Sequence, residues 1–279
     1  MEIFLILLGL VWLLVASIQD IKKREVANWL SFSLIIFTLA YKALYSAIYS
    51  NFWFFLHGLI GFFLFVCLAY IFYYARIFAG GDAKLLMSLG AILSFSNMFY
   101  ENLVIYASFV LLFLFSGGVY SLVYSGILAF KDREKFSKEF KKQIKLNKKL
   151  FYISFIFAVT SMIFVFYSKD LIFLAFPFLF LLFPVMLIYG KTVEENFMIV
   201  SVDSREVTIG DWLYEEVSVG RKKIKPYWEG LSEEEVKLLR KSRRKVKIKK
   251  GIPFVPAFLI AFLLLIIFKD YFSGLFSLI

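Results

Sequence analysis

Two aspartates, Asp20 and Asp82, lie where an ionisable side chain is costly and therefore informative. Asp20 directly follows the apolar run that opens the chain, and Asp82 directly precedes another apolar run. A carboxylate at such a depth is expensive, so a functional role is its default interpretation. Two carboxyl groups that share a site do not both ionise readily, and one holds a proton while the other acts as a base. Such a pair can deprotonate a water molecule for attack on a peptide carbonyl and protonate the departing amine.

The residues around Asp82 fit this chemistry but also fit a purely structural role. Gly80 and Gly81 directly precede the aspartate and leave room for an extended peptide backbone to approach it. Lys84 could stabilise the charged form of a nearby carboxylate, or its side chain could simply reach to the membrane surface. The alternative to a catalytic pair is a charge that only sets the orientation of the helix in the membrane, next to a turn. The residues alone leave both interpretations open.

The chain lacks the residues that other common catalytic mechanisms need. The chain has a single His, His57, and a single Cys, Cys67. These numbers exclude a thiolate metal cluster and a site with several histidines, and they exclude a Ser-His-Asp triad unless His57 itself serves. We therefore expect no metal and no cofactor, with water as the nucleophile.

The composition indicates a membrane protein. Hydrophobic residues make up 61% of the 279 residues and charged residues 19%, against about 45–50% and about 25% in soluble domains. This excess excludes a soluble globular enzyme and a disordered chain. The formal net charge is +11. In so apolar a chain we interpret this positive charge as the determinant of the chain's orientation in the bilayer. We expect no nucleic-acid partner.

The sequence predicts an all-α polytopic membrane protein with six to eight transmembrane helices and a small cytoplasmic α+β segment. A helix that crosses the hydrocarbon core needs about 20 apolar residues. Eight runs are candidates, and the fourth, sixth and seventh are short enough to leave a re-entrant segment open. The candidates are 3–19, 29–49, 52–75, 83–97, 103–130, 151–167, 171–189 and 253–268.

The distribution of positive charge predicts the topology. With eight spans, 29 of the 32 Lys and Arg residues fall on one side, which the positive-inside tendency makes the cytoplasm. We expect a multi-pass protein of the cytoplasmic membrane. Between Asp20 and Asp82 the chain crosses outward and back, so both aspartates return to the cytoplasmic end, where helices packed 8–10 Å apart could bring them together.

Five segments follow from these assignments. Residues 1–130 form membrane helices that carry both aspartates, 131–150 a basic amphipathic cytoplasmic loop, 151–190 further membrane helices, 191–252 a small cytoplasmic segment and 253–279 the last membrane helix.

Two of these segments carry finer predictions. In 131–150, Phe136 and Phe140 share one helical face, which favours either a helix lying on anionic lipid or a solvated basic loop. In 191–252, we expect strands at 197–202 and 206–209. A Ser-x-x-Glu capping pattern predicts a helix at about 231–247.

Three stretches together resemble the type IV prepilin peptidases, in particular the archaeal preflagellin and prepilin peptidases. Gly80-Gly81-Asp82-Ala83-Lys84 is similar to the GxGD motif of membrane aspartyl proteases. The stretch from Asp20 to Trp29 resembles the segment in which an aspartate closes the first helix, and Gly251-Ile252-Pro253-Phe254-Val255-Pro256 resembles the start of the last helix. The chain departs from the pattern at Ala79, in place of the first glycine, and at Ala27, where the family usually has proline.

The resemblance implies a function and a set of site residues. Asp20 and Asp82 would be catalytic. Gly80, Gly81 and Lys84 would contact the substrate, and Glu25 would meet the basic residues that precede the cleavage site. The substrates would be preflagellins or prepilin-like precursors, cut at the cytoplasmic face.

Two alternatives stay open. One is an intramembrane protease of the presenilin or signal-peptide-peptidase type, which the Ile-Lys-Lys-Arg sequence after Asp20 disfavours. The other is a membrane transporter or assembly protein in which the acids relay protons or set topology.

Overall fold

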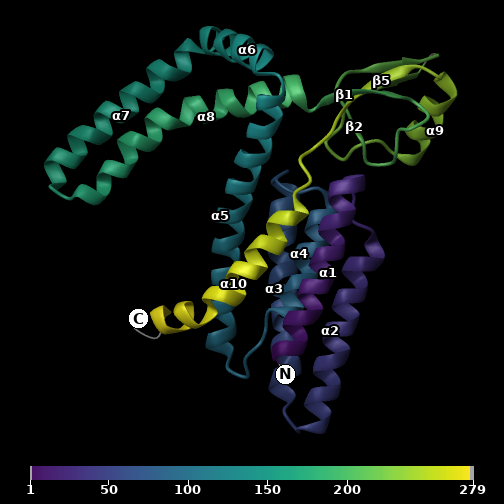
Figure 1. The fold of residues 1–279 in the computed structure, drawn as a ribbon, viewed down its shortest axis with the longest axis vertical. Helices are drawn as coiled ribbons and strands as arrows, with labels where there is room; N and C mark the ends of the chain where they lie inside the picture. The colour runs from purple at the N-terminus through teal and green to yellow at the C-terminus, as the bar shows by residue number, and fades with distance from the viewer. Residues whose placement is uncertain (1, 221, 277–279) are drawn as a thin grey trace. The chain divides into compact units, whose positions relative to one another are not determined.

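The fold was obtained as a computed structural model and is shown in Figure 1. It describes residues 2–220 and 222–276, those from 269 onward by their backbone alone. The outermost residues of the predicted segments 1–130 and 253–279 lie outside the described residues. The chain forms two compact units, Met1–Leu122 with Ile252–Ile279, and Val123–Gly251.

The first unit is a bundle of helices. Its helices are α1 (Glu2–Lys23), α2 (Asn28–Ile48), α3 (Phe52–Tyr74), α4 (Gly80–Ile92), the first part of α5 (Phe99–Lys131) and α10 (Val255–Phe276). In Figure 1, α1 to α4 lie side by side, and the contacts of α4 with α2 and α3 agree with this. The bundle therefore joins helices from both ends of the sequence.

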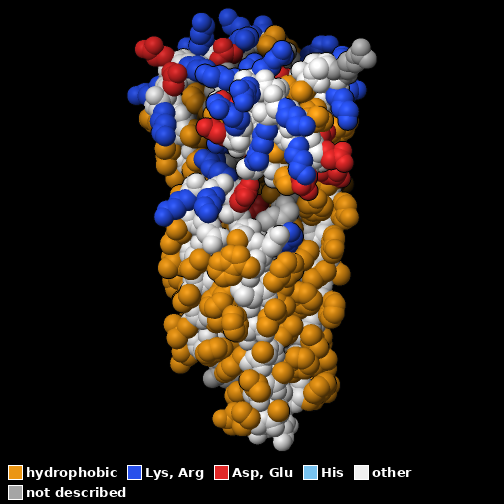
Figure 2. All heavy atoms as spheres, turned by 90° about the vertical axis from the view of Figure 1, so that its right-hand side faces the viewer, with side chains coloured by type: hydrophobic (Ala, Val, Ile, Leu, Met, Phe, Trp, Pro, Cys, Tyr) orange, Lys and Arg blue, Asp and Glu red, His pale blue; other side chains and the backbone are white. Residues whose placement is uncertain are grey.

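The outer faces of these helices are apolar. Trp29, Phe32 and Ile36 on α2 are all exposed. On the face seen in Figure 2, hydrophobic side chains cover the long helices, and Lys and Arg gather over the strand-containing part. Since lipid tails solvate apolar side chains, such surfaces suit helices that cross a bilayer.

The predicted fold class is confirmed. Within the described residues, six helices are long and apolar enough to span a membrane: Glu2–Lys23, Asn28–Ile48, Phe52–Tyr74, Phe99–Lys131, Lys148–Ser168 and Leu171–Phe197. The predicted span at 83–97 is wrong, because α4 has only 13 residues and is about 20 Å long at 1.5 Å per residue. The predicted last span begins at Val255, and its described apolar stretch, Val255–Phe268, is also shorter than a full span.

A buried lysine meets the end of this short helix. Lys42 on α2 is fully buried, and its ammonium group donates to the backbone carbonyl of Ser94, just beyond the end of α4. The same ammonium lies 4.0 Å from the ring centroid of Phe54. A cation is favourable near the C-terminal end of a helix because of the helix dipole. Lys42 therefore binds the segment that follows α4 inside an apolar region.

The helices of the second unit form a hairpin with a short helix packed on it. They are α6 (Arg133–Leu146), α7 (Lys148–Ser168), a 3₁₀ turn (Leu171–Leu174) and α8 (Ala175–Phe197). Phe136 stacks on Phe140 and also packs against the rings of Tyr189 and Phe197 on α8. The predicted helix within 131–150 is present, and α8 packs against Phe136 in its aromatic stripe. Whether this helix lies on lipid stays a prediction.

The strands of the second unit form two small antiparallel sheets. Strands β1 (Ile199–Asp203), β5 (Lys245–Lys249) and β2 (Trp212–Leu213) pair in the order β1-β5-β2, while β3 (Val217–Val219) pairs with β4 (Lys222–Ile224). In register, Val200 opposes Ile248 and Val202 opposes Val246. Their core also includes side chains of α9 (Glu233–Ser242), among them Val236 and Leu239.

Two details of this segment were predicted wrongly. Residues 206–209 lie in turns and irregular backbone rather than in a strand. The predicted helix at 231–247 ends at Ser242, because Arg243 takes a left-handed conformation (φ 49°) and the chain then enters β5. Lys245, Lys247 and Lys249 alternate with the buried Val246 and Ile248, which is a strand pattern.

Candidate active site

The end of α1 positions Asp20. Asp20 lies in the last turn of the helix and is buried, and its backbone carbonyl accepts the N–H of Arg24 at 2.8 Å. Arg24 has a left-handed conformation (φ 60°), which ends the helix. The side-chain oxygen of Gln19 accepts the N–H of Ala27 at 3.3 Å, and α2 begins at the next residue. The chain therefore turns immediately after the aspartate.

The start of α4 positions Asp82. Ala79 precedes the helix with extended backbone (φ −73°, ψ 162°), and Gly80, Gly81 and Asp82 are the first three helical residues. The half-buried carboxylate of Asp82 accepts a hydrogen bond from the backbone N–H of Ala79. An acidic side chain at the third helical position commonly reaches back in this way, so the local sequence fixes the direction of Asp82.

The two carboxyl groups lie near each other at one end of the bundle. The charges of Asp20 and Asp82 are close enough to interact, although 61 residues and two long helices separate them in the chain. Helix α1 contacts α4 directly. The structure thus brings together the two aspartates that the sequence predicted as a pair. Two neighbouring carboxyl groups can share one proton, which supplies an acid and a base in one place.

The start of α10 completes the surroundings of Asp20. The backbone N–H of Val255 donates to Oδ2 of Asp20 at 2.9 Å in a buried position. The N–H of Phe254 also hydrogen-bonds this carboxylate, and the charge of Arg24 acts on it. Asp20 is therefore held from both sides, by its own helix and by a helix more than 230 residues later in the chain.

Lys84 joins α4 to α2. Its ammonium group donates to Oδ1 of Asn28 at 2.7 Å, and Asn28 is the first residue of α2. The sequence singled out both residues, but not as partners. This bond ties the first turn of α4 to the loop that follows Asp20. A direct effect of Lys84 on a carboxylate stays a prediction.

The remaining predicted substrate residues lie in the segments next to the two aspartates. A Cβ placed on Gly80 would meet nothing within 4 Å, so this position faces open space. A Cβ on Gly81 would lie 3.7 Å from the backbone nitrogen of Val26, in the loop between α1 and α2. Glu25 is exposed in that same loop. Both glycines and Glu25 thus lie near the aspartates in the fold, and their contact with a substrate stays a prediction.

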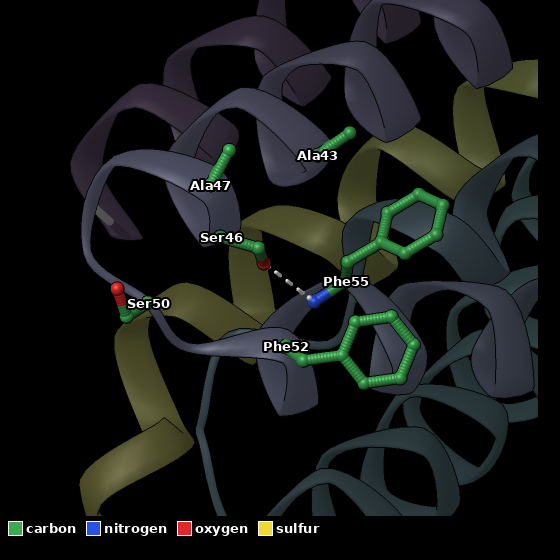
Figure 3. Close-up of a pocket in the computed structure, with 6 residues that line it drawn as sticks. All are labelled: Ala43, Ser46, Ala47, Ser50, Phe52 and Phe55. Atoms are coloured by element: carbon green, nitrogen blue, oxygen red, sulfur yellow. Dashed lines mark hydrogen bonds between the residues drawn. The ribbon is translucent and has the colours of Figure 1, made fainter.

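A pocket of about 450 Å³ lies elsewhere in the bundle (Figure 3). It is lined by the end of α2 and the start of α3, including Ser46, whose hydroxyl accepts the N–H of Phe55 at 3.1 Å. This is the opposite end of α2 from Asn28, so the pocket is remote from the aspartates. Its lining carries no acidic or basic side chain.

The backbone donors of Phe254 and Val255 were not predicted from the sequence. The signal was present, because Pro253 and Pro256 mark the start of a helix and the first N–H groups of a helix lack internal partners. Nothing local says which acceptor those groups meet. The donors could have been predicted, but not their pairing with Asp20.

Comparison with known proteins identifies a related family. Residues 7–125, which include both aspartates, match the sequence model of the type IV leader peptidase family. A preflagellin peptidase of Methanocaldococcus jannaschii is 34% identical over 92 residues, and one of Methanococcus voltae is 32% identical over 132 residues. The predicted resemblance is confirmed over this part of the chain. The comparison with solved structures finds no match.

The similarity is partial in both directions. The two alignments cover 33% and 45% of this chain and 39% and 56% of the relatives. The chain therefore spans about half or less of the curated relatives it matches. The matched region lies almost wholly in the first unit, whereas most of Val123–Gly251 lies outside the family match.

Proposed function

We propose that this protein is a membrane aspartyl endopeptidase that removes the short basic leader of preflagellins or type IV prepilin-like precursors. The observation that carries the proposal is the juxtaposition of Asp20 and Asp82 at the meeting point of α1, α4 and α10. Both aspartates lie within the region that matches the type IV leader peptidase family. The names of the two relatives suggest preflagellins as substrates.

The reaction needs one ionised and one protonated carboxyl group. The ionised carboxylate takes a proton from water while the water oxygen forms a bond to the carbonyl carbon of the scissile peptide. The protonated carboxyl then gives its proton to the departing nitrogen as the carbon–nitrogen bond breaks. The products are a carboxylic acid and an amine, and the proton now on the first aspartate restores the pair after exchange with solvent. No cofactor is required.

We place the reaction at the cytoplasmic face of the cytoplasmic membrane. Arg24 and Lys84 lie beside the aspartates, at one end of the bundle, and positively charged residues favour the cytoplasmic side. The apolar helix of the precursor would lie along the bundle with its leader in the cytoplasm. Gly80 leaves space for the peptide backbone, and Glu25 offers a negative charge to the basic leader.

The test is cleavage of a preflagellin by the purified full-length protein in detergent, followed by mass spectrometry of the product. Asp20→Asn and Asp82→Asn are each expected to lower kcat by about 10³-fold or more, near the upper range of general acid–base effects. The matched control is Asp203→Asn, which changes an aspartate of the second unit and should leave cleavage intact. Addition of EDTA should also leave the rate unchanged.

Each result has a defined meaning. A product shortened by the leader, made by the wild type and by the Asp203→Asn variant alone, supports the proposal. Cleavage that persists in either the Asp20→Asn or the Asp82→Asn variant contradicts the shared-acid-and-base mechanism. A wild type that cuts none of several precursors with different leaders contradicts the proposed function as a whole.

A further inference from the structure

The first turn of α10 makes an unusual contact with the predicted catalytic pair. Asp20 is buried, and its Oδ2 accepts the N–H of Val255 at 2.9 Å. Val255 is itself fully buried, and the neighbouring N–H of Phe254 donates to the same carboxylate. The two donors are consecutive along the backbone, so they fix both the position and the direction of the carboxylate.

The sequence of this turn concentrates donors on Asp20. Pro253 and Pro256 have no N–H, so Phe254 and Val255 are the only donors between them. The first N–H groups of a helix have no internal acceptor, and the dipole of the helix favours a negative charge at this end. The carboxylate of Asp20 meets both requirements.

Aromatic packing holds the same turn against the Asp82 segment. The ring of Phe78, four residues before Asp82, lies 6.0 Å from the ring of Phe254 and 5.8 Å from that of Phe258. Phe258 in turn stacks on Phe113 of α5 with centroids 4.3 Å apart. The hydroxyl of Ser116 donates to the carbonyl of Ala257 at 3.1 Å. These buried contacts anchor α10 independently of Asp20.

We propose that Val255 is the positioning residue that makes Asp20 the general base of the pair, leaving Asp82 as the general acid. This inference rests on the proposed peptidase function. Hydrogen bonds donated to a carboxylate favour its charged form. Asp20 accepts two backbone N–H groups from α10, whereas Asp82 accepts one, from Ala79. Asp20 therefore takes the proton from water, and Asp82 delivers its proton to the leaving nitrogen.

The kinetic test removes one donor. Val255→Pro deletes the N–H at the first helical residue, a position that proline tolerates, and its ring displaces the carboxylate of Asp20. We expect kcat to fall about 10- to 100-fold with KM unchanged, the range given by loss of a hydrogen bond to a charged group. Val255→Ala keeps the N–H and should recover most of kcat.

The control places the same substitution at the start of a helix in the second unit. Glu233 is the first residue of α9, and Ser232 before it has the extended backbone (φ −75°, ψ 164°) that proline requires. Glu233→Pro should leave both kcat and KM unchanged. A Val255→Pro variant that cleaves like the wild type overturns the inference, and so does an effect confined to KM.

A spectroscopic test covers the case in which Val255→Pro fails to fold. Labelling with ¹³C-phenylalanine and ¹⁵N-valine selects the four Phe–Val amides, those of Val66, Val110, Val165 and Val255, and Val255→Ala identifies the last. The Val255 amide signal should move strongly in Asp20→Asn and less in Asp82→Asn. A Val255 amide signal that does not move in Asp20→Asn overturns the hydrogen bond between Val255 and Asp20. Because this readout needs no activity, it separates failure of the inference from failure of the proposed function.

Discussion

The backbones of Gly61 on α3 and Gly90 on α4 cross in direct contact. A Cβ on Gly90 would lie 2.3 Å from the carbonyl oxygen of Gly61, and a Cβ on Gly61 would lie 2.3 Å from the carbonyl oxygen of Gly90. Small residues let membrane helices approach this closely. Because α4 carries Asp82 at its other end, this crossing sets the position of the predicted acid.

Alanine at the crossing should destabilise the bundle. In Gly90→Ala the new methyl group meets backbone, which cannot move aside alone, and overpacking of this kind costs about 1–3 kcal/mol. We expect a lower Tm in detergent and reduced cleavage. The matched control is Gly118→Ala on α5, where a Cβ meets nothing within 4 Å. Equal Tm values for the two variants would show that the helices do not cross as described.

The Lys84–Asn28 hydrogen bond predicts a coupled pair. Lys84→Met and Asn28→Ala each remove the same 2.7 Å bond between α4 and α2. We expect each variant to lower kcat/KM several-fold and the double variant to be no worse than either, since residues in contact are not additive. The measurement is a double-mutant cycle on precursor cleavage. Additive losses would mean that Lys84 acts through another partner, such as a carboxylate of the site.

The capping box of α9 predicts a local effect in the second unit. Ser232 and Glu235 hydrogen-bond each other's backbone N–H groups, at 3.4 and 2.9 Å. Ser232→Ala should cost about 1 kcal/mol and raise amide exchange in α9 roughly 5-fold, with cleavage unchanged. Ser218→Ala, at an exposed position in β3, is the control and should leave α9 exchange unchanged. Hydrogen exchange of the intact protein measures both.

An ion pair in the second unit predicts a pH effect. Hydrogen bonds from the side chain and backbone of Arg205 to Asp203 lower the pKa of Asp203 to about 2. Because this pKa is depressed, the stabilisation is complete above the ordinary value of 3.8 and is lost as the pH falls through about 2. Asp203 should therefore remain ionised at about pH 3.

Carboxyl NMR of the full-length protein, labelled with ¹³C-aspartate, tests this titration. Arg205→Gln should raise the midpoint of Asp203 toward 3.8. Lys245→Gln should raise it less, because the charge of Lys245 is the smallest of the causes that act on Asp203. A midpoint that stays unchanged in Arg205→Gln would contradict the ion pair.

The sequence predicted that the two aspartates lie at the same end of the bundle, because the topology requires it. Two long apolar runs between Asp20 and Asp82 return the chain to the same end of the bundle, whatever the details of packing. One of the eight candidate spans is too short in the structure. The apolar run at 83–97 looks continuous, but α4 ends at Ile92, and Lys42 donates to the carbonyl of Ser94 just beyond it. That lysine comes from another helix, so no local pattern indicates where α4 ends.

Contacts between distant segments also decide what local patterns leave open. The stripe of Phe136 and Phe140 has the period of an amphipathic helix, and the rings that pack against Phe136 come from α8. The helix predicted at 231–247 extends into the strand at Lys245–Lys249, because the strand's partners, β1 and β2, lie earlier in the chain. In each case the periodicity was visible, but the element that decided the outcome was far away in sequence.

The discontinuity of the first unit has a consequence for biosynthesis. Asp20 and Asp82 are translated early, but the turn of α10 that holds Asp20 is translated only after the whole of Val123–Gly251. A nascent chain can therefore place both aspartates in the membrane without the donors of Phe254 and Val255. The arrangement around Asp20 is completed only when the last helix inserts, which delays its assembly until the second unit has been synthesised.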